Sequence, residues 1–190
     1  MPRFPLAAIL LILSLCAAPL KAEPLDTEPA LRSALVAALW PSDIVRLADQ
    51  YRQRYPDGPA AASAALWRDR AADSQRVLAR SDVRLHRAAF NPERADEPTL
   101  GDLRLAALGD RDAAVRMARQ AQRSKDDSPA AANRYVGWLQ YATQLGHQNA
   151  SYELALFFRR EAQPVLASKY ENLALNLGYE PPVALDNIRK

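Results

Sequence analysis

Histidine, cysteine and glycine are scarce in this chain, and the catalytic signatures that depend on them are missing. There are two histidines, one cysteine and six glycines among 190 residues. We find no GxSxG elbow, P-loop, GxGxxG or SxxK motif, which mark common nucleophilic, phosphate-binding and dinucleotide-binding sites. His86 and His147 are far apart and show no HExxH-type spacing, so no metal site is predicted. The sequence therefore favours a protein that is not an enzyme and carries no cofactor.

The first 22 residues have the pattern of a secretory signal peptide. Arg3 is followed by an apolar run from Leu6 to Leu15, which is about half of what a membrane span needs. Ala22, a small residue, stands directly before the first acidic residue, and cleavage after it fits the pattern. The frequent alanine and arginine are typical of a bacterial chain. We therefore expect a signal peptide at 1–22 and a periplasmic mature protein.

The single cysteine decides whether a membrane anchor is expected. The stretch Leu13-Ser14-Leu15-Cys16 is similar to the lipobox of bacterial lipoproteins, although Leu15 stands where that motif has a small residue. Contact with a membrane is expected only if Cys16 is lipidated. If cleavage follows Ala22, the mature chain has no cysteine, which excludes disulfides, thiolate catalysis and cysteine metal sites together.

The excess of positive charge lies largely in the predicted signal peptide. The chain has 25 basic and 22 acidic residues, and loss of Arg3 and Lys21 leaves 23 basic ones. The remaining arginines are interleaved with acidic residues, as on a solvated helix surface. Because phosphate binding needs a clustered excess of lysine and arginine, no nucleic acid partner is expected.

Apolar residues recur at helical spacing through most of the remaining chain. Four stripes follow the pattern of an amphipathic helix. They are Ile44, Leu47, Ala48, Tyr51 and Tyr55; Tyr135, Trp138, Leu139, Ala142 and Leu145; Ala150, Leu154, Phe157 and Phe158; and Leu166, Tyr170, Leu173 and Leu177. Pro41, Pro129 and Pro164 stand where helices are expected to begin. The pattern predicts an all-α protein with roughly nine or ten helices.

Three Leu-Gly pairs mark an internal repeat. Gly109, Gly146 and Gly178 each follow a leucine that ends an apolar stripe, and they are 37 and 32 residues apart. Each is expected to turn the chain between antiparallel helices, because glycine readily takes the left-handed conformation that ends a helix. Small or aromatic residues recur around them: Ala113 and Ala150 four residues after, Ala142 and Ala174 four before, and Trp138 and Tyr170 eight before. Such helix pairs bury their apolar faces by stacking, which predicts an α-solenoid.

The middle copy of this repeat resembles a known family. Trp138-Leu-Gln-Tyr-Ala142-Thr-Gln-Leu-Gly146-His147-Gln-Asn-Ala150-Ser-Tyr152-Glu-Leu154 is similar to the Sel1-like repeat, a relative of the tetratricopeptide repeat. The chain around Gly178 is similar to the end of a next unit, and the chain after Ala106 to the start of an earlier one. The resemblance covers roughly residues 100–190. It implies stacked antiparallel helix pairs whose concave surface cradles another protein or peptide. It also implies structural roles for the repeat positions Gly109, Gly146, Gly178, Ala113, Ala150, Trp138, Ala142, Tyr170, Ala174 and Leu154.

The chain is expected to have two helical parts. An irregular stretch at 91–98, with two prolines and four charges, predicts a linker between an N-terminal part, 23–90, and the Sel1-like part, 99–190. The N-terminal part is similar to tetratricopeptide units of envelope proteins, and an unrelated cap is the alternative. His86 is expected on a short helix that Ser81-Asp82 opens.

His147 is the repeat residue that most suggests catalysis. It directly follows the turn glycine, and the equivalent positions in the other copies are Asp110 and Tyr179. A residue that differs in type between copies of one unit is expected to lie in a surface turn rather than to act as a general base. The repeat positions of Trp138 and Tyr170 likewise predict core packing over the lining of a binding groove.

Three functions remain as hypotheses. The pattern and the resemblance favour an exported adaptor or scaffold of the cell envelope that binds another protein without chemistry. A periplasmic immunity protein that blocks a toxic effector is the alternative. A cell-wall or polysaccharide hydrolase would need two carboxyl groups across a cleft. Acidic clusters such as Glu93, Asp96 and Glu97 are expected to be solvated loop charges instead. The sequence predicts neither the partner nor the face that binds it.

Overall fold

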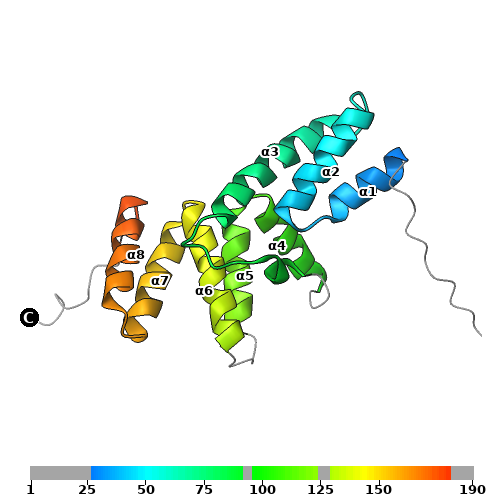
Figure 1. Ribbon diagram of the computed structural model, residues 1–190. Helices are drawn as coiled ribbons and strands as arrows, with labels where there is room; N and C mark the ends of the chain where they lie inside the picture. Colours follow the sequence, from blue (N-terminus) through cyan, green and yellow to red (C-terminus); the bar gives the residue numbers. More distant parts are fainter. Residues whose placement is uncertain (1–26, 92–95, 124–128, 181–190) are drawn as a thin grey trace, which may run out of the picture.

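The computed structural model describes residues 27–91, 96–123 and 129–180. Within these ranges the regular structure is entirely helical, with eight α-helices and one 3₁₀ helix and no strand. Neighbouring helices pack in pairs, with α1 to α3 at one end of the molecule and α8 at the other (Figure 1). This confirms the all-α class and the solenoid-like stacking. The signal peptide expected at 1–22 and Cys16 lie outside the described residues, among which no helix is long and apolar enough to cross a membrane.

Three helices form the N-terminal end of the molecule. They are α1 (Glu28–Ala37), α2 (Pro41–Arg54) and α3 (Ala61–Leu78). The buried face of α2 contains the predicted stripe of Ile44, Leu47, Ala48 and Tyr51. The Tyr51 hydroxyl donates to Glu28 Oε1 at 2.6 Å and accepts the backbone N–H of Ala60 at 3.2 Å. One buried side chain therefore ties all three helices together.

Five helices follow, each packed against the next along the chain. They are α4 (Glu97–Ala107), α5 (Arg111–Arg123), α6 (Pro129–Gln144), α7 (Gln148–Arg160) and α8 (Pro164–Asn176). Gly109 and Gly146 end α4 and α6 with φ of 82° and 88°. At each joint the glycine N–H and the next N–H bond back to the last helical turn, as in Gly146 to Thr143 O at 2.9 Å and His147 to Ala142 O at 3.0 Å. These bonds satisfy carbonyl groups that the helix end would otherwise leave unpaired.

The turn between α7 and α8 uses the same geometry without a glycine. Ala162 has a φ of 53°, and it is the one non-glycine residue with positive φ in the described part of the chain. Its N–H bonds to Arg159 O at 3.3 Å, and the Gln163 N–H bonds to Phe158 O at 2.9 Å. An L-residue pays a steric cost in this conformation that glycine does not.

The two expected parts share one core. Phe90 lies between Trp40 of the N-terminal end and Trp138 of α6, with ring centroids 5.1 and 4.8 Å away. Arg104 of α4 donates to the carbonyl of Ala38 and lies over the Trp67 ring of α3. Burial lowers the pKa of Arg104 to about 10. Aromatic and cationic contacts therefore join the N-terminal helices to the repeat part directly.

Helix α4 begins inside the stretch 91–98, where a linker was expected. Residues 92–95 of this stretch lie outside the described part, and α4 already begins at Glu97. The Asp96 carboxylate caps this helix by accepting the Thr99 N–H at 3.1 Å. Of the three acids expected to be solvated loop charges, Glu97 is in the first helical turn instead, and Asp96 is exposed but caps the helix, where negative charge is favourable. Glu93 lies outside the described residues.

Residues 81–86 do not form the short helix that was predicted to start at Ser81-Asp82. Residues 81–82 make a turn, 83–86 are not helical, and a 3₁₀ helix, η1 (Arg87–Phe90), follows with His86 before it. Val83 and Leu85 are buried, whereas Arg84 and His86 are exposed. This alternation is that of an extended chain with one face against the protein. We call residues 81–86 the strap.

Candidate peptide-binding groove

The residues with predicted structural roles lie at helix joints and in the core. Gly109, Gly146 and Gly178 all have φ above 80°. The other seven are at most 2% exposed: Ala113, Ala150, Trp138, Ala142, Tyr170, Ala174 and Leu154. The Tyr170 hydroxyl also accepts a hydrogen bond from Gln140 of α6, a residue that the sequence did not single out.

His147 lies in the turn, but its side chain is largely buried rather than at the surface. It is 14% exposed, and its Nδ1 accepts the Ala150 N–H at 3.0 Å, which caps α7. Nε2 faces Asp112 at 3.2 Å. Asp110, at the equivalent position, caps α5 by accepting the Ala113 N–H at 2.7 Å. The residue type changes between the two copies, but the position keeps a hydrogen-bond acceptor for the helix end.

The strap crosses α6 at a glycine and a glutamine. The backbone N–H of Arg84 donates to Gln140 Oε1 at 2.9 Å. A Cβ on Gly137 would lie 2.5 Å from the Arg84 carbonyl oxygen, so only glycine lets the strap approach this closely. Gln140 is 5% exposed and donates through Nε2 to the Tyr170 hydroxyl at 3.3 Å. One amide side chain thus connects the strap, α6 and α8.

Asp82 fixes the beginning of the strap. Its carboxylate accepts from Arg80 Nε at 3.0 Å and from Gln144 Nε2 at 3.3 Å, and Lys169 Nζ of α8 lies 3.5 Å away. The hydrogen bond from Arg80 is the main reason why the pKa of Asp82 is lowered. The carboxylate is therefore charged at neutral pH and holds α6 and α8 to the same point of the chain.

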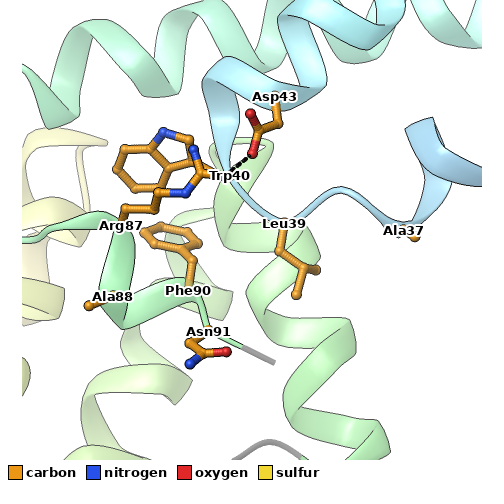
Figure 2. Close-up of a pocket in the computed structure, with 8 residues that line it drawn as sticks. All are labelled: Ala37, Leu39, Trp40, Asp43, Arg87, Ala88, Phe90 and Asn91. Atoms are coloured by element: carbon orange, nitrogen blue, oxygen red, sulfur yellow. Dashed lines mark hydrogen bonds and ion pairs between the residues drawn. The ribbon is translucent and has the colours of Figure 1, made fainter. Parts of the chain in front are cut away.

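The other end of the strap runs into η1, which is held by an ion pair and an aromatic side chain (Figure 2). Arg87 donates to Asp43 of α2 at 2.6 Å, and the Phe90 ring meets the Trp40 ring edge to face. These residues line a cavity of about 410 Å³ that is bounded largely by apolar groups. Asn91 has the one side-chain amide among the residues that line this cavity.

A second cavity, of about 440 Å³, opens beside the strap and between α6 and α8. We call it the α6–α8 groove. Its apolar surface comes from Val136, Phe157, Phe158, Leu166 and Tyr170, its amide groups from Asn133, Gln140 and Gln163, and its charges from Asp82, Arg84, Glu161 and Lys169. The Phe158 and Tyr170 rings stack with centroids 5.5 Å apart at an interplanar angle of 10°. Burial is the main reason why the pKa of Tyr170 is raised, so its hydroxyl stays protonated.

This lining suits an extended peptide better than a helix. A helix has its backbone groups bonded internally and binds through an apolar face alone. An extended segment brings unpaired N–H and C=O groups, and buried ones must find partners. Amide side chains supply donors and acceptors together, and the apolar surface accepts side chains. The strap already shows this recognition, because Gln140 binds its backbone.

The described residues show two features that bear on the hydrolase hypothesis. The two carboxyl groups with a resolved change in pKa, Asp82 and Asp96, both have it lowered. A general acid in glycoside cleavage needs a raised pKa. No group of three or more metal-ligating side chains is found in the described ranges.

Comparison with family models, with curated proteins and with solved structures found no match. The Sel1-like resemblance of roughly residues 100–190 therefore stays a prediction from the residues that carry it.

Proposed function

We propose that this protein is an exported, non-catalytic adaptor that binds an extended segment of a partner protein in the α6–α8 groove. The observation that carries the proposal is the groove itself, where amide side chains border an apolar surface and Gln140 already holds an extended piece of backbone. The predicted signal peptide supports a place in the cell envelope. The mechanism is placement of one protein beside another.

The size of the groove suits a short segment of a partner, which is what an adaptor of this kind would bind. A cavity of about 440 Å³ holds a short segment rather than a protein face. Burying one leucine-sized side chain contributes about 1.5–3 kcal/mol, and ordering the segment offsets part of it. A toxin blocked one-to-one would need a standard interface of about 1,600 Å² in total. The groove therefore fits a moderate, reversible contact.

A blocking side chain in the groove tests this function. Ala132 is exposed and lines the groove, whereas Ala130 is exposed on the same helix outside it. We expect Ala132→Trp to abolish recovery of an envelope partner by the tagged protein, and Ala130→Trp to leave recovery unchanged. Equal recovery by both variants would contradict the proposal. Recovery of one small toxic enzyme in a tight one-to-one complex, insensitive to Ala132→Trp, would favour the immunity function instead.

A further inference from the structure

The two ends of the α6–α8 groove carry opposite charges that no ion pair neutralises. At the strap end Asp82 is held by Arg80 and lies near Lys169. Arg84 is exposed there, and no ion pair is found for it in the described part of the chain. At the other end, where α7 passes into α8, Glu161 is exposed and likewise lacks an ion-pair partner among the described residues. Among the charged side chains that line the groove, the strap end is therefore net positive, and Glu161 is the one charge at the far end.

The positions of these charges along the groove follow from the helices that border it. Gln140 lies at the strap end of α6 and Asn133 toward the other end, so the ends are about 10 Å apart at 1.5 Å per residue. Arg84 and Glu161 both line the groove, Arg84 from the strap and Glu161 from the turn between α7 and α8. An extended chain covers about 10 Å in roughly three residues.

We propose that the groove selects a partner segment that carries opposite charges on its two sides. The segment is extended, carries an acidic residue that meets Arg84 and a basic residue that meets Glu161, and has apolar residues between them. The two charges are about three or four residues apart. This inference rests on the proposed function, since it specifies the partner of the same groove.

Three peptides test the requirement for two opposite charges with purified protein. The probes are the capped, fluorescently labelled peptides TEVTLKT, TEVTLET and TKVTLKT, which share the apolar positions and differ only in the two charges. Fluorescence anisotropy measures the Kd of each. We expect the mixed-charge peptide to bind about 3-fold more tightly than either other peptide, because an exposed ion pair contributes up to about 1 kcal/mol. The preference is expected to weaken as salt is raised.

Charge reversal in the groove distinguishes failure of this inference from failure of the proposed function. We expect Arg84→Glu to favour TKVTLKT and Glu161→Lys to favour TEVTLET. The matched controls Arg52→Glu and Asp57→Lys reverse exposed charges of the N-terminal end, and they should rank the three peptides by Kd as the wild type does. If the peptides bind but neither groove variant changes their ranking by Kd, the charge inference is wrong while the docking function stands. If no peptide binds, both are overturned.

Discussion

Replacing Gly137 with alanine tests the contact between the strap and α6. Glycine inside a helix costs roughly 0.5–1 kcal/mol relative to alanine, so helix propensity alone predicts stabilisation. Here the added Cβ would lie 2.5 Å from the Arg84 carbonyl oxygen and 3.2 Å from Leu85 Cδ1. The strap must move, which disturbs the Gln140 hydrogen bond and the burial of Leu85. Overpacking of this kind costs about 1–3 kcal/mol, so we expect Gly137→Ala to lower the free energy of unfolding.

Gly101 provides the matched control for this substitution. It lies in α4, and a Cβ there would meet no atom within 4 Å. Gly101→Ala is therefore expected to raise the free energy of unfolding by roughly 0.5–1 kcal/mol. Urea denaturation followed by circular dichroism measures both variants. A Gly137→Ala protein as stable as Gly101→Ala, or more so, would refute the close packing of the strap on α6.

Substitutions at four further positions test the joints and the strap. Ala162→Gly should raise the free energy of unfolding by about 1 kcal/mol, because glycine adopts a positive φ without steric strain. A lower free energy of unfolding would show instead that the Ala162 methyl group packs favourably. Gly146→Val should destabilise by at least about 1–3 kcal/mol, since a β-branched residue resists a φ of 88°; unchanged thermal unfolding would argue against that turn. His147→Ala should cost about 0.5–2 kcal/mol through the lost cap of α7, with His147→Asp restoring most of it; equal Tm values would remove the capping role. Asp82 has a lowered pKa in the folded state, so its contribution to the free energy of unfolding is present above about pH 3.9 and is lost as pH falls through the folded pKa. The stability difference between Asp82→Asn and wild type should therefore shrink in acid. A difference that is independent of pH would contradict this.

The joints and the core were predictable from sequence because their causes are local. Helical periodicity identified the buried faces, and glycine after a terminal leucine identified two helix joints and the residue that ends α8. The turn at Ala162 was missed because alanine gives no signal for positive φ. The cap at His147 was missed because a histidine acceptor looks unlike the aspartate in the neighbouring copy.

The strap and the groove depend on contacts between residues far apart in the chain. Gln140 and Arg84 are 56 residues apart, and no local pattern pairs them. Two weak signals were present in hindsight: a glycine in the middle of an otherwise strong helix at Gly137, and the alternation of Val83 and Leu85 with polar neighbours. An isolated glycine inside a helical pattern often marks a place where another backbone approaches closely.

Site-specific photo-crosslinking tests most directly whether the groove docks a partner. A photoreactive phenylalanine derivative at Ser81, an exposed residue at the edge of the groove, samples a segment bound there, and the same group at Ala130 samples the neighbouring surface of α6. Mass spectrometry of the cross-linked peptides from living cells identifies what each position touches. We expect the group at Ser81 to cross-link one short segment of an envelope protein, with acidic and basic residues on either side of apolar ones, and the group at Ala130 not to. The same cross-links from both positions, or none from Ser81, would contradict docking in the groove.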